Sequence, residues 1–150
     1  MRPSIQEYYS AIAVVASARS TCRRRKVGAV LVDKDHRLLS IGYNGNPSGH
    51  QHCIDHPCPG AFMKSGTGLD KCESIHAEIN AIGSCLDLHR IQTCYSTTSP
   101  CIHCVKSLLA TNCQEIVFLQ EYPHSESKAL WEKSGRIWTH YQNEKLTEVL

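Results

Sequence analysis

The hydrophobic pattern at the start of the chain predicts an amphipathic helix. Apolar residues recur three or four positions apart between residues 5 and 16, which places them on one face of an α-helix. Ser4 precedes this run and Glu7 follows three positions later, as in a capping box, where the serine oxygen accepts a hydrogen bond from a backbone N–H of the first turn. We therefore expect the first helix to begin directly after Ser4.

The next pattern predicts a β-hairpin. Residues 27–32 and 38–42 are rich in the aliphatic residues that strands favour, and Asp33-Lys34-Asp35 between them is typical of a turn. Two strands joined by so short a connection pair antiparallel. We expect this hairpin to form the first part of a sheet.

The second half of the chain alternates between helix and strand patterns. We expect helices at residues 75–86, 101–110 and 125–133, and strands at residues 94–98, 116–119 and 136–140. Strands alternating with helices after an opening hairpin are typical of a sheet of mixed strand directions between helices. The predicted fold class is therefore α/β, with a three-layer α/β/α architecture. A length of 150 residues suits one domain, which we assign to residues 1–150.

Residues 43–74 show no periodicity and are rich in Gly, Pro, His and Cys. Stretches of this length without regular structure are uncommon inside a compact domain and are usually functional. We expect this loop to serve the function directly, or to be held in place by something other than an apolar core.

Composition and charge exclude several classes of protein. The formal net charge of +2 gives no sign of a polyanionic partner such as nucleic acid. No apolar run approaches the roughly 20 residues that a membrane-spanning helix needs. The start of the chain lacks the apolar block of a signal peptide. We expect a cytoplasmic protein that binds neither nucleic acid nor a membrane.

Nine cysteines are many for this length. A secreted disulfide scaffold fits poorly, because the number is odd and a chain this long does not need staples. In a reducing compartment metal ligation is the better interpretation. Cys85, Cys94 and Cys113 fall on the faces of predicted helices and strands, and we expect them to be small apolar core residues.

Two short motifs at the starts of predicted helices carry the candidate chemistry. The first holds His76 and Glu78 two positions apart, and the second holds Cys101 and Cys104 directly after Pro100. One imidazole and two thiolates leave the fourth position of a tetrahedral zinc ion open for water, which marks a catalytic site. Separately, the histidine would suggest an ordinary helix residue and the cysteine pair a redox motif or half a zinc finger. Together and in this order they are typical of zinc nucleobase deaminases.

The chemistry of such a site assigns a role to each residue. Zinc lowers the pKa of its water to about 7, so that hydroxide becomes the nucleophile. We expect His76, Cys101 and Cys104 to bind this zinc ion. Glu78 is the catalytic residue, because a carboxylate beside the metal-bound water can take its proton and deliver it to the ring nitrogen and the leaving amine.

Further segments carry a resemblance to a known family. Residues 22–30 read Cys-Arg-Arg-Arg-Lys-Val-Gly-Ala-Val, residues 42–49 read Gly-Tyr-Asn-Gly-Asn-Pro-Ser-Gly, and His52-Cys53 follows. With the zinc motifs they resemble, over nearly the whole chain, the deoxycytidylate (dCMP) deaminases of the cytidine-deaminase-like superfamily. The Gly-Tyr-Asn-Gly stretch is the most diagnostic. The resemblance implies a cytidine-deaminase-like fold and the conversion of dCMP to dUMP and ammonia, which feeds thymidylate synthesis.

The resemblance also implies roles for residues that would bind the substrate. Asn44 would hydrogen-bond the deoxyribose 3′-hydroxyl, the backbone of Ala77 and the carbonyl of Ser99 would read the pyrimidine edge, and Tyr122 would pack near the sugar or base. Asn-Gly is also an everyday turn signal, and without the zinc motifs the turn would be preferred.

The substrate's phosphate needs cations, and residues 23–26 form the one basic run of the chain. Guanidinium groups bind phosphate oxygens in pairs, and this run enters the first strand where a nucleotide would sit. We take Arg25 and Lys26 as the phosphate-binding candidates. A solvated basic run with no ligand is the alternative.

Regulation and assembly follow from the resemblance alone. Members of this family are typically hexamers activated by dCTP and inhibited by dTTP. The triphosphate binds with Mg²⁺ near the segment that corresponds here to Gly42, Tyr43, Asn44 and Gly45. The implied partners are therefore dCMP, both effectors and further copies of the chain.

The remaining cysteines suggest a second zinc site. Cys22 precedes the first strand, whereas Cys53, Cys58 and Cys72 lie in the long loop. Four such ligands would clamp the loop closed around a structural zinc ion, and some deoxycytidylate deaminases have a second zinc bound in these regions. Cys22 and Cys53 are the first choice as ligands; Cys58, Cys72 and His56 compete for the other two places. The alternative is a set of free thiols in a mobile loop.

Two other functions remain open at this stage. One is a related deaminase acting on tRNA adenosine, free cytidine or guanine, although a tRNA enzyme would be expected to have a broader basic surface. The other is a zinc-bound regulatory or nucleic-acid-binding module without catalysis. Glu78 argues against the latter, because a structural zinc site has no need of it.

Overall fold

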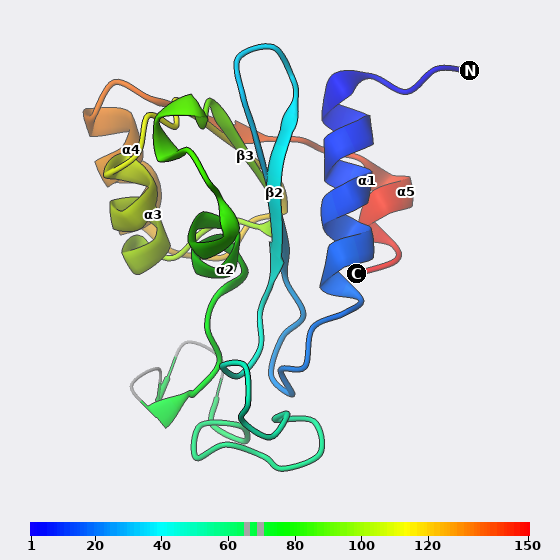
Figure 1. Ribbon diagram of the computed structural model, residues 1–150, viewed down its shortest axis with the longest axis vertical. Helices are drawn as coiled ribbons and strands as arrows, with labels where there is room; N and C mark the ends of the chain where they lie inside the picture. The colour runs from blue at the N-terminus through cyan, green and yellow to red at the C-terminus, as the bar shows by residue number, and fades with distance from the viewer. Residues whose placement is uncertain (65–66, 69–70) are drawn as a thin grey trace.

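A computed structural model describes residues 1–64, 67–68 and 71–150 and shows a five-stranded sheet between two layers of helices (Figure 1). The strands are β1 (Gly28–Val32), β2 (Leu38–Tyr43), β3 (Thr93–Thr98), β4 (Glu115–Gln120) and β5 (Ile137–His140). The helices are α1 (Ile5–Ser17), α2 (Ala77–Ser84), α3 (Ile102–Leu109), α4 (Ser125–Lys133) and α5 (Glu144–Thr147), with a 3₁₀ turn, η2 (Leu88–Arg90). None of the helices within the described ranges has the length and apolar character that crossing a bilayer requires.

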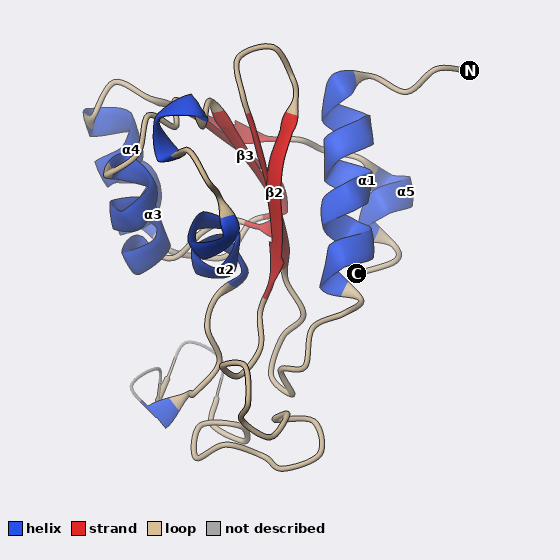
Figure 2. Cartoon of the chain, viewed as in Figure 1, coloured by secondary structure: helices blue, strands red, loops and turns tan. Residues whose placement is uncertain are grey.

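The sheet has the order β2-β1-β3-β4-β5 and mixed strand directions. β1 runs antiparallel to β2 and to β3, whereas β3, β4 and β5 are parallel. Helices α1 and α5 cover one face, and α2, α3 and α4 cover the other (Figure 2). The predicted three-layer α/β/α architecture and the predicted hairpin are therefore confirmed.

The predicted elements agree with the observed ones to within about two residues at each end. The largest shift is at α2, which begins at Ala77 because His76 has an extended backbone (ψ 151°) and occupies the N-cap position. Two elements were missed, η2 and α5. Neither has a buried residue, so neither leaves a hydrophobic period in the sequence.

Helix α1 packs closely on the sheet. The Ser4 hydroxyl oxygen accepts a hydrogen bond of 3.1 Å from the Glu7 N–H, as the capping-box pattern predicted. Gly28 on β1 permits the close approach, because a Cβ atom there would collide with the carbonyl of Ala13. This contact places the core of the first layer between α1 and the centre of the sheet. Its buried members are Tyr9, Ala13, Val30, Val32, Tyr95 and Val117.

The second core lies between the other face of the sheet and helices α2 to α4. Trp131 and Phe118 are its largest fully buried side chains. Cys94 and Cys113 are fully buried in it, as predicted. Cys85 differs, because it follows α2 as its C-cap and is only partly buried against this core.

Two hydrogen bonds hold helix α2 against β2, and the glycine at position 42 allows the two elements to approach closely. The Asn80 side chain donates a 2.8 Å hydrogen bond to the carbonyl of Tyr43, and the Ser40 hydroxyl donates to the carbonyl of Ala81. A Cβ atom at Gly42 would overlap the carbonyl of Ala77, so only glycine allows this spacing. The N-terminus of α2 is therefore held at the end of the sheet where β3 also ends.

Candidate active site

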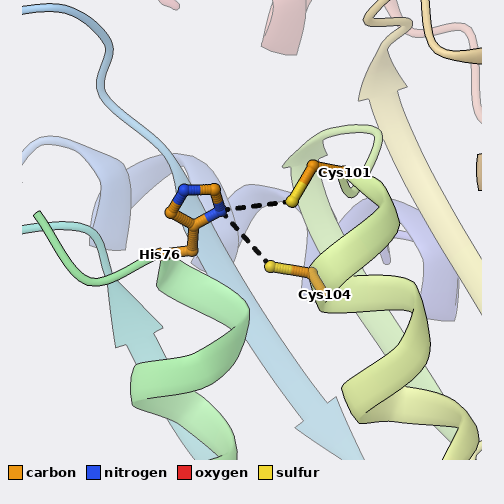
Figure 3. A group of neighbouring side chains, drawn as sticks. All are labelled: His76, Cys101 and Cys104. Carbon is orange, nitrogen blue, oxygen red and sulfur yellow. Dashed lines mark hydrogen bonds between the residues drawn. The ribbon is translucent and has the colours of Figure 1, made fainter. Parts of the chain in front are cut away.

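Three predicted metal ligands converge at the starts of two helices. His76 is the N-cap of α2 and Cys101 is the N-cap of α3, with Cys104 in the first turn of α3. Nδ1 of His76 lies 3.5 Å from Sγ of Cys101 and 3.4 Å from Sγ of Cys104 (Figure 3). All three ligand atoms lie within 4.8 Å of one another. The structure therefore brings together the trio that the sequence predicted.

The spacing of these atoms fits a zinc ion. Zn–S bonds of about 2.3 Å and Zn–N bonds of about 2.0–2.1 Å, set at a tetrahedral angle, separate the nitrogen and sulfur atoms by about 3.6 Å. The two observed separations, 3.4 and 3.5 Å, are close to that value. The same soft donor set, one imidazole and two thiols, is typical of zinc. The observed distances therefore agree with binding of a zinc ion, which the sequence alone could not show.

The pKa values of the Cys101 and Cys104 thiols are shifted in opposite directions. The hydrogen bond from Cys104, together with the weaker effect of His76, lowers the pKa of Cys101 to about 3. The same contact raises the pKa of Cys104, and burial adds to the effect. The bond to Cys101 raises the pKa of His76 in turn. Such a pair carries one negative charge without a metal and must lose a further proton when it binds one.

Glu78 lies against the metal ligands and is almost completely buried, with 4% of its surface exposed. Its Oε2 atom accepts from the thiol of Cys104 at 3.3 Å, and its Oε1 atom accepts from the hydroxyl of Ser96 at 3.2 Å. Burial raises the pKa of this carboxyl above its ordinary value, because the charged form is poorly solvated. A raised pKa suits a group that must take up a proton and release it at neutral pH.

A cavity of about 350 Å³ opens beside this cluster. Its floor includes His76, Glu78 and Cys101, at the carboxyl end of β3. Ligands of open α/β sheets bind outside such strand ends. The four residues expected to contact the base and sugar also line this cavity, namely Asn44, Ala77, Ser99 and Tyr122.

The basic run divides between the cavity and the solvent. Arg24 and Arg25 line the cavity, whereas Lys26 is exposed and is not among the described residues that line it. The guanidinium of Arg25 lies 4.1 Å from the centre of the Tyr122 ring. Arg25, one of the two predicted phosphate-binding residues, therefore lines the cavity beside Tyr122, and Arg24, which was not one of the two, lines it as well.

The Asn44 side chain lines the cavity and also forms hydrogen bonds with the backbone of the basic run. Its Oδ1 atom accepts from the N–H of Val27 at 2.8 Å, and its Nδ2 atom donates to the carbonyl of Arg25 at 2.7 Å. These two bonds fix the path of the basic run beside the cavity. Each amide atom can form one further hydrogen bond, so the side chain keeps capacity for a ligand.

The segment from Gly42 to Gly45 is connected to the catalytic helix. Tyr43 accepts the hydrogen bond from Asn80 described above, and the backbone of Gly45 exchanges hydrogen bonds of 3.1 and 2.8 Å with Ile75. Ile75 directly precedes the metal ligand His76. Movement of this segment would therefore reach the start of α2 through backbone contacts.

Several cavity residues carried no motif in the sequence. Phe62 and Met63 from the long loop, and His124 after β4, complete the wall of the cavity. Ser96 contacts Glu78 from the middle of β3. A polar residue in a buried strand was the only available signal for Ser96, and the loop residues had none, because their position depends on how the loop folds back.

Arginines before β1 hold the long loop through polar contacts, and its cysteines pack with Ala61 in a small apolar cluster. Arg24 donates hydrogen bonds of 2.9 Å to the carbonyls of Lys64 and Thr67, and Arg23 bonds to the carbonyl of Cys53 at 3.4 Å. These bonds tie residues far apart in the sequence to the start of β1.

The loop cysteines are gathered more loosely than the catalytic ones. Cys53 and Cys58 are buried with their Sγ atoms 3.8 Å apart, and Cys72 packs against them. Two thiolates on one tetrahedral zinc ion are also separated by about 3.8 Å. Cys22 is buried too, and burial raises the pKa of the Cys72 thiol. His56 is exposed. Among the described residues, these cysteines do not reach the mutual 4.8 Å spacing of the catalytic trio.

Comparison with known proteins places this site in a family. The model of the cytidine and deoxycytidylate deaminase zinc-binding region matches residues 3–120. The chain is 34% identical to the deoxycytidylate deaminase of Saccharomyces cerevisiae over 131 residues, which cover 84% of this chain and 41% of that one. It is 39% identical to the deoxycytidylate deaminase of Mycobacterium phage D29 over 127 residues, which cover 80% of this chain and 98% of that one.

A solved structure extends the likeness to three dimensions. The dCMP deaminase of the cyanophage S-TIM5, in complex with dCMP and dUMP, superimposes with a TM-score of 0.71 and 26% identity over 94% of this chain and 99% of that one. This likeness confirms the cytidine-deaminase-like fold. The matched residues 3–120 contain both zinc motifs. The chain therefore belongs to the cytidine and deoxycytidylate deaminase family.

Proposed function

We propose that this chain converts dCMP and water to dUMP and ammonia. The observation that carries this proposal is the convergence of His76, Cys101 and Cys104 beside the buried Glu78, at the floor of a cavity that also contains Asn44. The relatives from yeast and phage D29 are named deoxycytidylate deaminases, and the cyanophage structure holds dCMP and dUMP. The region shared with this chain spans 41% of the yeast relative's length.

The chain's own residues supply most of the proposed mechanism. Zinc, when bound by His76 and the two cysteines, supplies a Lewis acid that lowers the pKa of a water molecule to about 7. Glu78 takes one proton from the attacking water and delivers it to the ring nitrogen; it then takes the second proton, from the hydroxyl added to the ring carbon, and delivers it to the amine, which leaves as ammonia. The N–H of Ala77 is one of the first of α2 and has no partner within the helix, so it is free to bind the base. The carbonyl of Ser99 accepts from the amine.

The phosphate is assigned to Arg24 and Arg25. Both line the cavity, and one terminal nitrogen of Arg24 is buried and has no hydrogen-bond partner among the described residues. A buried guanidinium N–H without a partner is costly unless a ligand completes it. This arrangement favours a nucleotide over a nucleoside, because only the former brings an anion to that end of the cavity.

We propose a second, structural zinc ion bound by Cys22, Cys53, Cys58 and Cys72. The 3.8 Å separation of the Cys53 and Cys58 sulfur atoms suits it; Cys53, Cys58 and Cys72 lie in the long loop, and Cys22 precedes β1. The ion would hold the loop that carries Phe62 and Met63 against the cavity. Binding of this kind contributes directly to folding free energy.

Regulation by dCTP and dTTP, bound with Mg²⁺ near Gly42–Gly45 in a hexamer, is a further part of the proposal. It rests on the match of this segment to the family, and the contacts of Tyr43 and Gly45 with α2 give it a physical route. The proposed setting is the cytoplasm, where the product dUMP feeds thymidylate synthesis.

An ammonia-release assay tests the proposed function. Zinc-loaded protein is incubated with dCMP, CMP, deoxycytidine and dCTP, each with and without dCTP or dTTP as effector. We expect dCMP to have the highest kcat/KM, dCTP to activate and dTTP to inhibit. Turnover of CMP or deoxycytidine without turnover of dCMP would reject the substrate but keep the zinc chemistry. No turnover of any substrate would reject both.

A further inference from the structure

The catalytic glutamate has a partner that no zinc motif contains. Ser96 lies within β3 and has only 2% of its surface exposed. Its hydroxyl lies 3.2 Å from Oε1 of Glu78 and 2.7 Å from the carbonyl oxygen of Thr98. Its backbone is fixed, because it pairs with Ala29 on β1 and with Phe118 on β4. The hydroxyl is therefore presented to the glutamate by the rigid centre of the sheet.

The two oxygen atoms of Glu78 have different surroundings. Oε2 contacts the thiol of Cys104 and so faces the metal ligands, whereas Oε1 points to Ser96 on the strand. A carboxyl group at the end of a flexible side chain needs such a contact on one oxygen to hold the other in place. We propose that Ser96 is a positioning residue that holds Oε1 of Glu78 and thereby directs Oε2 to the reacting water. This inference rests on the proposed deaminase function.

A serine hydroxyl suits this task better than an amine, which has no acceptor when it is charged. It has one hydrogen and two lone pairs, so it serves as a donor to a carboxylate or as an acceptor from a carboxylic acid. The nearby carbonyl of Thr98 accepts the hydroxyl hydrogen when Glu78 does not. Because strand pairing on both sides holds Ser96, its hydroxyl can keep this contact with Glu78 without movement of the strand.

A purely structural role is the alternative, because the bond to Thr98 alone would satisfy a buried carbonyl. Ser17 provides a matched control. It is also buried, with 5% of its surface exposed, and its hydroxyl donates to the backbone carbonyl of Val14 at 2.6 Å, in α1 on the opposite face of the sheet. Replacing either serine by alanine removes a buried hydroxyl that bonds to a backbone carbonyl, but only one of the two contacts Glu78.

The test compares Ser96→Ala with Ser17→Ala in the zinc-loaded protein. Loss of a hydrogen bond to a charged group corresponds to a rate factor of about 10 to 100. We expect S96A to lower kcat for dCMP by about that factor, with KM changed less than about twofold and zinc content unchanged. S17A should retain wild-type kcat. Ser96→Thr keeps a hydroxyl on the same carbon and should recover most of kcat.

A structural measurement makes the outcome independent of turnover. In crystals of zinc-loaded S96A, the Glu78 carboxyl should leave its wild-type position or occupy two, while the zinc site is unchanged. A Glu78 in its wild-type position, or a kcat within about twofold of that of S17A, would overturn the inference. If wild-type protein itself fails to deaminate dCMP, the proposed function fails instead. A structural role predicts losses of stability in S96A and S17A with kcat unaffected in both.

Discussion

The chain gathers cysteine at two places that differ in how the thiols are held. Cys101 and Cys104 lie at the start of α3, and their partner His76 caps α2. Cys53 and Cys58 lie instead in the loop that follows β2, and contacts from the arginines before β1 hold that loop. Both groups offer soft ligands, but only the first has its ligand atoms within 4.8 Å of one another among the described residues.

The difference is the one expected between a catalytic metal site and the structural site proposed for the loop cysteines. Ligands on the ends of packed helices keep their geometry without the metal, so the metal can bind there with a position left open for chemistry. Loop ligands gain their geometry from the metal, so that binding energy becomes folding energy. We expect the first site to control turnover and the second to control the stability of the loop and the affinity for substrate.

The largest expected effect separates the proton shuttle from the ligands of the first site. Glu78→Ala should lower kcat by about 10³-fold or more, because general acid–base catalysis contributes about 10² to 10⁴. Zinc bound at His76 and the two cysteines should remain. Steady-state kinetics and metal analysis on the same sample measure both quantities. Loss of zinc from this variant would show that Glu78 is a ligand.

The number of zinc ions per chain tests the proposed site at the loop cysteines. Cys53→Ser should remove about one zinc ion per chain, leave the other, and lower the temperature at which the protein unfolds. Cys85→Ser is the matched control, because that thiol is partly buried and bonds to the carbonyl of Asp87, outside both groups. A wild-type protein with one zinc ion per chain would contradict the second site.

The affinity for substrate tests whether Arg25 binds the phosphate of dCMP. Arg25→Ala should raise KM for dCMP about tenfold, the usual effect of losing one hydrogen bond to a charged group, and should leave KM for deoxycytidine unchanged. Lys26→Ala should change neither value, because Lys26 is exposed and is not among the described cavity residues. Equal losses with both substrates would indicate that Arg25 supports the fold and does not bind phosphate.

The smallest effect concerns the scaffold far from both cysteine groups. The backbone N–H of Arg37 lowers the pKa of Asp33, and the side chain of Arg90, 2.6 Å away, lowers it further. A lowered pKa in the folded state means that this contribution is complete above the unfolded pKa of about 4 and is lost as the pH falls through the folded value. Asp33→Asn should therefore be less stable than wild type at pH 7.

Denaturant unfolding at several pH values measures this difference, which should shrink as the pH falls below about 4. Zinc content at His76 should be the same in both proteins at pH 7. A difference that grew on acidification would contradict the assignment of Asp33 as an ionised, hydrogen-bonded group.

The sequence predicted the regular elements and the first cysteine group for the same reason. The apolar periods that revealed α2 and α3 also fixed which residues stand at their starts, so the proximity of His76 and Cys101 followed from short-range pattern and a known motif. Helix α5 was missed because it has no buried residue and thus no period.

Other features depend on long-range packing that leaves no local pattern. Arg24 and Arg25 of the basic run line the cavity, whereas Lys26 is not among the described lining residues, and Asn44 bonds to the backbone of this run. The contact of Ser96 with Glu78 joins residues 18 apart in the sequence. Neither could be read from residue types alone, because both require the register of the sheet.

The source of the oxygen atom in the product tests the central claim most directly. Zinc-loaded protein is incubated with dCMP in water enriched in ¹⁸O, and the nucleotide product is analysed by mass spectrometry. We predict that the dUMP contains one ¹⁸O atom on the pyrimidine ring and forms together with one equivalent of ammonia. Formation of this product should stop when zinc is removed. Unchanged dCMP, or dUMP formed equally well after removal of zinc, would contradict the account.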